Sequence, residues 1–215
     1  MIKAEKITLN YGDLKVLKGV NLNIKEGEFV SIVGASGAGK TTLLQIIGTL
    51  ENPTSGKIII DETDITSLSD KELSNFRNEN IGFVFQFHNL LTEFTALENV
   101  CLPAFISGKN RNEIEERAKE LLNLLNMGNR LDHKPNELSG GEQQRVAVAR
   151  ALINNPSIIL ADEPSGNLDS ENAKSLHELL QKLNKDLNFT IVVVTHNDKL
   201  ANITDRKLEI KDGKI

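Results

Sequence analysis

The segment Gly34-Ala35-Ser36-Gly37-Ala38-Gly39-Lys40-Thr41-Thr42 decides the fold of this chain. It matches the phosphate-loop pattern G-x-x-x-x-G-K-[ST], and it follows an apolar run at residues 29–33 that predicts a buried strand. Apolar positions after the segment predict a helix, so backbone N–H groups of the glycine-rich turn would surround an anion at a helix start. Lys40 would supply a mobile charge for the outer phosphates, and the Thr41 hydroxyl would bind Mg²⁺. The alternative is an ordinary glycine-rich turn between a strand and a helix.

Patterns on both sides of this segment predict an α/β fold with a mainly parallel sheet and one domain, residues 1–215. We expect strands at residues 2–9, 20–25, 29–33, 57–60, 81–85, 157–161 and 190–194, the first two belonging to an N-terminal antiparallel β-subdomain. Helical spacing of apolar residues predicts a helical subdomain at 88–145, inserted into a core made of 1–87 and 146–215. The last residues, 206–215, predict a hairpin that turns at Asp212-Gly213.

Composition narrows the class of protein. The chain has 215 residues and a net charge of −5, which argues against a nucleic-acid partner. A single cysteine, Cys101, leaves no intramolecular disulfide. We expect no signal peptide, since Met1 to Lys6 holds no apolar core, and no stretch approaches the ~20 apolar residues of a spanning helix. If the protein serves a membrane process, another chain supplies the membrane part.

A second glycine-containing segment, Leu138-Ser139-Gly140-Gly141-Glu142-Gln143, precedes an apolar helical pattern. Ser139 suits a helix N-cap, and the two glycines leave backbone N–H groups bare at the helix start. The segment therefore predicts a second anion site, or else a simple helix cap.

An acidic pair, Asp162-Glu163, ends the strand predicted at 157–161. Because successive side chains of a strand point to opposite sides, one carboxylate would face a metal ion and the other an attacking water. The alternative is an acidic pair that merely caps a strand. Taken alone, Gln86 and His196 are polar residues at strand ends, and Tyr11 is an aromatic that packs near an edge strand.

The phosphate loop, the hexapeptide at 138–143 and the run Ile158-Ile-Leu-Ala-Asp-Glu163 together resemble the ATP-binding cassette (ABC) family, essentially from end to end. Segments 82–88, 90–91, 94–100, 161–169 and 207–213 are most similar to the ATPases of lipoprotein-releasing (Lol-type) systems, and resemble macrolide-exporter-like ATPases as well. The resemblance implies a P-loop ATPase that hydrolyses ATP with Mg²⁺ and powers transport.

The resemblance also implies roles for single residues. Asp162 would be the metal-side acid, acting through water, and Glu163 the general base. Gln86 would touch Mg²⁺ or the attacking water, His196 would hydrogen-bond the γ-phosphate, and Tyr11 would stack on adenine. The departures from the usual family pattern lie at three positions that carry no catalytic group, Glu62, Ser165 and Asn197.

Two chains would face each other head to tail, so that Ser139, Gly140 and Gly141 of each close on the γ-phosphate of the other. The segment 165–169 would lie along that interface. The second anion site gives this homodimer a local physical motive, because one nucleotide does not need two helix-start phosphate sites.

An apolar stretch follows Gln86 and comprises Phe87, Leu90, Leu91, Phe94 and Leu97. It either belongs to the subdomain core or, by resemblance, accepts a cytoplasmic helix of an integral membrane permease subunit. The expected location is the cytoplasmic face of the inner membrane, with no nucleic-acid partner. Rival readings are the ATPase of a related exporter or small-molecule importer, a soluble cassette protein acting on ribosomes or DNA, and a nucleotide switch without useful turnover.

Overall fold

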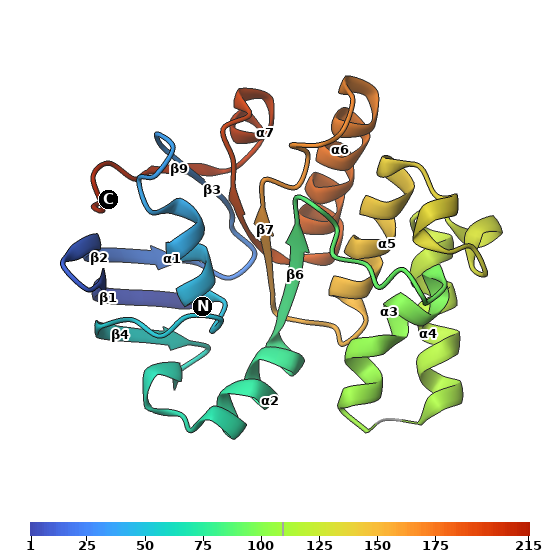
Figure 1. Ribbon diagram of the computed structural model, residues 1–215, viewed down its shortest axis with the longest axis horizontal. Coiled ribbons are helices and arrows are strands. Elements are labelled where there is room, and N and C mark those ends of the chain that lie inside the picture. The colour runs from blue at the N-terminus through green and yellow to red at the C-terminus, as the bar shows by residue number, and fades with distance from the viewer. Residues whose placement is uncertain (109) are drawn as a thin grey trace.

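The computed structural model describes residues 1–108 and 110–215. Its centre is a five-stranded sheet in the order β6-β7-β8-β3-β9, with every neighbouring pair parallel (Figure 1). The strands are β3 (Phe29–Val33), β6 (Ile81–Phe85), β7 (Ile158–Asp162), β8 (Thr190–Val194) and β9 (Arg206–Glu209). Continuous apolar sequence in β3, β7 and β8 fits this arrangement, since parallel strands are covered on both faces. The prediction of a mainly parallel sheet is confirmed.

A second sheet is antiparallel and has the order β2-β1-β4-β5. Its strands are β1 (Ile2–Tyr11), β2 (Leu14–Ile24), β4 (Ser55–Ile60) and β5 (Thr63–Asp64). The first two are longer than the alternating pattern predicted. They form the N-terminal β-subdomain beside the parallel sheet (Figure 1).

Two apolar clusters cover the two faces of the parallel sheet. Helix α1 (Lys40–Ile47) lies between the sheets and buries its leucines and isoleucines against both. Helices α5 (Gly140–Leu152) and α6 (Ser170–Leu187) cover the opposite face. Alternate residues of β8 join the two clusters, Ile191 and Val193 on one side and Val192 and Val194 on the other.

Helices α3 (Ala96–Ile106) and α4 (Arg111–Leu124) pack with α5 beside this core. Short 3₁₀ turns at Gly128–Arg130 and Pro135–Glu137 precede α5. This helix continues past residue 145, the predicted end of the helical subdomain. The remaining elements are a 3₁₀ turn at Ile65–Ser67, α2 (Asp70–Asn80) and α7 (Asp198–Asn202). Among these described residues, no helix combines the length and apolar character needed to cross a membrane.

The predicted terminal hairpin forms only at its turn, where Lys211 and Lys214 make an antiparallel bridge. The prediction is wrong for the preceding residues, because β9 pairs in parallel with β3. The turn itself forms, with φ of 49° at Asp212 and 77° at Gly213. Its glycine carbonyl accepts from the Lys18 amide at 2.8 Å, and a Cβ on Gly213 would lie 2.3 Å from the Val16 carbonyl oxygen. The turn therefore docks on β2, while the open edge of β3 takes the strand before it.

Candidate active site

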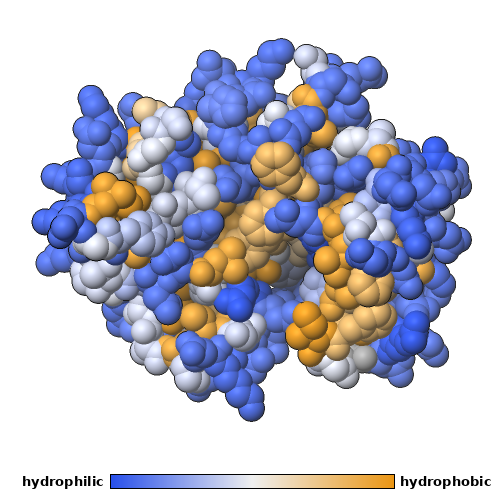
Figure 2. Space-filling model, in the orientation of Figure 1, coloured by the Kyte–Doolittle hydropathy of each residue, from blue (hydrophilic) through white to orange (hydrophobic). Residues whose placement is uncertain are grey.

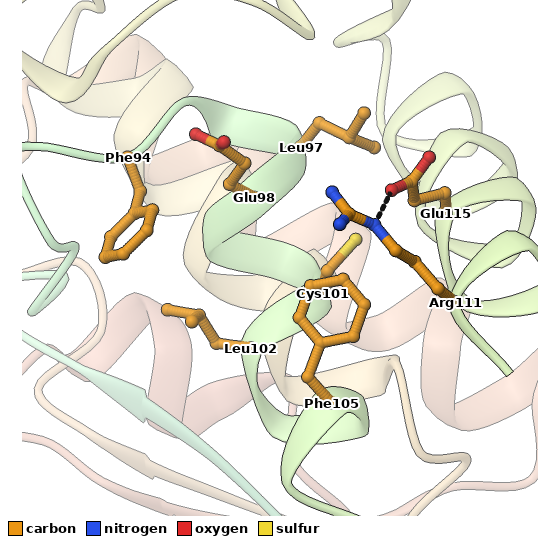
Figure 3. A pocket seen from close by; sticks show the side chains of 8 residues that line it. All are labelled: Phe94, Leu97, Glu98, Cys101, Leu102, Phe105, Arg111 and Glu115. Carbon is orange, nitrogen blue, oxygen red and sulfur yellow. Dashed lines mark hydrogen bonds and ion pairs between the residues drawn. The ribbon is translucent and has the colours of Figure 1, made fainter. Parts of the chain in front are cut away.

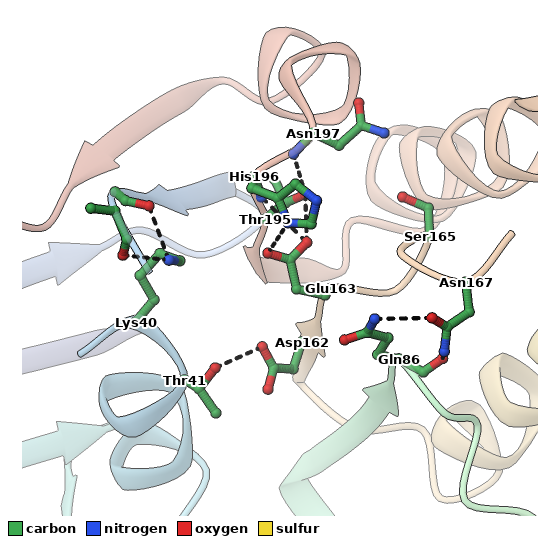
Figure 4. Close-up of polar contacts among 12 residues, drawn as sticks. Lys40, Thr41, Gln86, Asp162, Glu163, Ser165, Asn167, Thr195, His196 and Asn197 are labelled. Carbon is green, nitrogen blue, oxygen red and sulfur yellow. Dashed lines mark hydrogen bonds and ion pairs between the residues drawn. The ribbon is translucent and has the colours of Figure 1, made fainter. Parts of the chain in front are cut away.

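The phosphate loop joins β3 to α1 at the carboxyl edge of the parallel sheet (Figure 4). Gly37 and Gly39 have φ of 76° and 102°, values that glycine adopts without strain. The Lys40 ammonium bends back over this loop and donates to the carbonyls of Gly34 at 3.0 Å and Ala35 at 2.9 Å. The positive charge thus already lies within the concavity of the loop.

Thr41 and Asp162 meet across the sheet edge. The Thr41 hydroxyl, at the start of α1, donates to Oδ1 of Asp162, the last residue of β7, at 3.1 Å. Burial raises the pKa of the Asp162 carboxyl, and the Glu163 charge adds to this while the Thr41 hydrogen bond opposes it. A hydroxyl and a carboxylate oxygen held together in this way are hard oxygen donors, so the pair fits Mg²⁺.

The direction of the Glu163 side chain is set by its own backbone conformation and not by the alternation of side chains along a strand. It follows the end of β7 and has φ of 44°, a left-handed conformation that turns its side chain toward β8. Its carboxylate accepts from the Thr195 hydroxyl at 3.2 Å and the His196 amide at 3.3 Å, and lies 2.7 Å from Nδ1 of His196. The strand-alternation argument for the acidic pair is therefore corrected. The two carboxylates separate because the chain leaves the strand after Asp162.

Gln86 directly follows β6 and lies beside this pair, since Phe85, the last residue of β6, is in register with Asp162. Its Nε2 donates to Oδ1 of Asn167 at 3.1 Å, and the Asn167 amide donates back to the Gln86 carbonyl at 3.2 Å. A Cβ on Gly166 would lie 2.8 Å from Gln86 Nε2, so the 165–169 segment fits closely over this side chain. Gln86 is thereby linked to the segment that follows Glu163.

Ser139 caps α5 as the sequence predicts. Its hydroxyl accepts from the Glu142 amide at 3.3 Å, and its own amide donates to Oε2 of Glu142 at 2.8 Å. This hydrogen bond and the Arg130 guanidinium, 2.9 Å from Oε1, lower the pKa of Glu142 to about 2. Ser139 and Gly140 are exposed, and within the described residues no hydrogen bond joins 139–141 to 34–42. The two predicted anion sites of one chain are therefore separate.

Tyr11 also lies apart from the other predicted site residues. It ends β1, opposite Leu14, and half of its surface is exposed. Desolvation and the neighbouring Glu51 carboxylate raise the pKa of its phenol. The structure brings together six predicted residues at one sheet edge, namely Lys40, Thr41, Gln86, Asp162, Glu163 and His196.

The sequence reasoning missed the residues that support this group. Thr195 holds Glu163, and Asn167 holds Gln86. The Ser165 hydroxyl lies 3.0 Å from Nε2 of the buried His177 on α6. Thr195 carried one usable signal, because it adjoins His196 at a predicted strand end.

Comparison with known proteins identifies the family. A family model described as ABC transporter matches residues 17–166. The chain is 60% identical over 215 residues to "Lipoprotein-releasing system ATP-binding protein LolD" of Bacteroides thetaiotaomicron, covering 100% of this chain and 99% of that one. It is 49% identical over 219 residues to the protein of the same name from Geobacter metallireducens, covering 100% and 97%.

Solved structures agree. The dimeric structure of MJ0796, described as a bacterial ABC transporter cassette, matches with a TM-score of 0.92 and 49% identity, over 100% of this chain and 96% of that one. The same cassette in a dimeric post-hydrolysis state bound to ADP and Pi matches with a TM-score of 0.91 and 48% identity, with the same coverage. The chain described here belongs to the ABC transporter family and has its ATPase fold.

Proposed function

We propose that this protein is the ATP-hydrolysing subunit of a transporter that releases lipoproteins from the inner membrane. One observation carries the enzymatic part: Glu163 and its partner His196 lie at the same sheet edge as the phosphate loop and Asp162. The cargo follows from the names of the relatives that are 49% and 60% identical over the whole chain.

The first step is to hold the phosphates of ATP. Residues 34–42 offer backbone N–H groups at the start of α1, and Lys40 exchanges its two carbonyl partners for phosphate oxygens. The exposed Tyr11 ring stacks on adenine. Thr41, Asp162 and Gln86 would hold Mg²⁺, which would neutralise charge on the outer phosphates.

The second step is attack by water on the γ-phosphorus. Glu163 accepts the proton from water as the new P–O bond forms and the bond to the β-phosphate oxygen breaks, giving ADP and phosphate. Thr195 and the His196 amide fix the orientation of this carboxylate. The His196 side chain is largely exposed, so its ring is free to reach the γ-phosphate.

The pocket is completed by a second copy of the chain. Ser139, Gly140 and Gly141 of one copy close on the γ-phosphate bound by the other, and residues 165–169 line the interface. Support comes from the exposed helix start of α5 and from the dimeric form of the MJ0796 cassette.

The membrane partner binds beside the segment that contains Gln86, in a groove lined by Phe85 and Asn89. A hollow of about 450 Å³ lies between the core and α3, with apolar side chains along its rim (Figure 2). We call it the docking groove; its lining includes Leu50, Phe83, Phe85, Asn89, Pro103, Ile106 and Arg150. Phe87 is exposed over 73% of its surface and Ile106 over 80%, as expected for anchors of a partner helix.

A smaller pocket of about 270 Å³ extends the apolar surface along α3 (Figure 3). The Arg111 guanidinium lies 2.8 Å from the Glu115 carboxylate at its edge and 5.9 Å from the centre of the Phe105 ring. Cys101 lies at its base with its pKa raised to about 11 by burial, consistent with a small apolar residue. Of the apolar stretch after Gln86, Leu90 and Leu97 pack against the core, whereas Phe87, Leu91 and Phe94 remain exposed for a partner.

Affinity purification of the tagged protein from native membranes tests the assignment. We expect integral membrane subunits to copurify, and the reconstituted complex to release a lipoprotein only when ATP is hydrolysed. Copurification with ribosomes or DNA, or a complex that hydrolyses ATP without releasing lipoprotein, would contradict it. The expected location is peripheral, on the cytoplasmic face of the inner membrane.

A further inference from the structure

Arg150, near the carboxyl end of α5, contacts the chain just after Gln86. Its Nη1 donates to the Asn89 carbonyl at 2.6 Å and its Nη2 to the His88 carbonyl at 2.7 Å. These partners are 61 and 62 residues away in sequence. One side chain thus joins two segments that the proposed mechanism uses separately. We call residues 86–89 the Gln86 loop.

The Gln86 loop is strained where Arg150 holds it. His88 and Asn89 have φ of 61° and 49°, so two successive non-glycine residues are left-handed. Such a backbone conformation is unfavourable for a non-glycine residue unless its surroundings stabilise it. Two charge-assisted hydrogen bonds to the carbonyls of these same residues supply that stabilisation.

The Arg150 guanidinium has no carboxylate partner within the part of the chain that the structure describes. Burial lowers its pKa, which is a cost that an exposed arginine avoids. Because the buried Arg150 guanidinium donates to two main-chain carbonyls, its role is to position the backbone.

Helix α5 also contacts the segment that precedes Ser139. Gln143 lies seven residues before Arg150, two turns away on the same helical face. Its Nε2 donates to the carbonyls of Pro135 at 2.9 Å and Leu138 at 3.1 Å. Helix α5 therefore hydrogen-bonds to the segment before Ser139 near one end and to the Gln86 loop near the other.

We propose that Arg150 is a positioning residue that fastens the Gln86 loop to α5, so that the loop and Ser139 move together. Arg150 and Asn89 also line the docking groove, where an occupant would press on this contact. The second half of the inference, transmission from the membrane subunit to Ser139, rests on the proposed function. The first half concerns this chain alone.

Amide hydrogen exchange on the isolated protein tests the first half. In Arg150→Met, exchange at residues 87–91 should become at least about tenfold faster, the loss expected for charge-assisted hydrogen bonds. Arg150→Lys keeps one charged donor and should restore part of the protection. Arg117→Met is the matched control, because Arg117 also bridges from a helix to a left-handed asparagine, Asn155, at 2.9 Å. Unchanged exchange at 87–91 in Arg150→Met would overturn the inference, as would an equal effect of Arg117→Met there.

ATP hydrolysis with the copurified membrane subunits tests the second half. Arg150→Met should lose stimulation by those subunits, by about tenfold in kcat, with KM for ATP unchanged. A merely structural role would lower the melting temperature and raise KM without a selective loss of stimulation. Full stimulation in Arg150→Met would overturn transmission through this residue. If the wild-type protein is not stimulated, the proposed function fails, while the exchange result still decides whether Arg150 holds the loop.

Discussion

The carboxylate of Glu163 lies 2.7 Å from Nδ1 of His196, although 33 residues separate them along the chain. Parallel pairing of β7 with β8 creates this contact, because both residues follow the carboxyl ends of neighbouring strands. Asp162 faces the phosphate loop from the same strand end. One sheet edge therefore carries two carboxylates with different partners and different proposed tasks.

Replacing Glu163 tests its task as general base. Glu163→Gln should lower ATP turnover by about 10²- to 10⁴-fold while leaving ATP bound, because the water loses its proton acceptor. The stalled protein should elute as a dimer in gel filtration with saturating Mg·ATP. Glu26→Gln, in an exposed turn, is the control. Retained turnover in Glu163→Gln would refute the assignment.

Removal of the Lys40 charge tests the phosphate loop. Lys40→Ala should weaken ATP binding by about tenfold to a hundredfold, the range expected for lost charge-assisted hydrogen bonds, and abolish turnover. Isothermal titration calorimetry measures the affinity, with Lys15→Ala on the exposed surface of β2 as control. Equal affinity and turnover in wild type and Lys40→Ala would show that the loop binds no phosphate.

Gly140→Ala separates stability from function at the second anion site. A Cβ at Gly140 would meet only Leu168, at 3.7 Å, so the free energy of unfolding should hold or rise by up to about 1 kcal/mol. The same methyl group would obstruct the partner's phosphate, so ATP turnover should fall at least about tenfold. Asp70→Ala, at the equivalent position of α2, should leave turnover unchanged. Normal turnover in Gly140→Ala would argue against a phosphate at this helix start.

Acid should weaken the cap of α5. The pKa of Glu142 falls from 4.5 to about 2 on folding, so its stabilisation is complete above about pH 4.5 and is lost as the pH falls toward 2. At pH 7 the free energy of unfolding of the wild type should exceed that of Glu142→Gln by about 1–2 kcal/mol, a modest figure because the Glu142 side chain is 19% exposed. This difference should shrink between pH 4.5 and 3. Urea unfolding of both proteins measures the gap. A constant gap across this range would contradict the ionic origin of the stabilisation.

The turn between β4 and β5 carries strain that glycine would relieve. Asp61 and Glu62 have φ of 46° and 67°, and both are exposed. Glu62→Gly should raise the melting temperature by about 1–3 °C, because the second position of such a hairpin turn favours glycine. Glu62→Ala keeps the Cβ and serves as control; an equal rise in both variants would point to charge removal as the cause.

The sequence predicts elements whose signals are local. Strand 29–33 and the helix predicted after the phosphate loop are confirmed. The Asp212-Gly213 turn is also local, and it forms. The hairpin extends no further than the bridge between Lys211 and Lys214, because the preceding strand β9 pairs in parallel with β3.

The site depends on contacts that the sequence does not reveal. Gln86 and Asn167 are 81 residues apart, and their mutual hydrogen bonds require the pairing of β6 with β7. In the sequence Arg150 is an ordinary charged residue of a helix. Its carbonyl partners cannot be predicted from neighbouring residues, because Asn89 lies 61 residues away. The left-handed backbone of Glu163 arises from its docking on β8, where its amide donates to the Val194 carbonyl at 2.9 Å.

A structure of Glu163→Gln with Mg·ATP tests the shared pocket most directly, through the distance from Ser139 Oγ to the nearest γ-phosphate oxygen. We predict a contact of about 3 Å, a normal hydrogen bond, made to the nucleotide of the other copy. A Ser139 that lies beyond hydrogen-bond reach of every phosphate, in every assembly of the ATP-bound protein, would contradict the account.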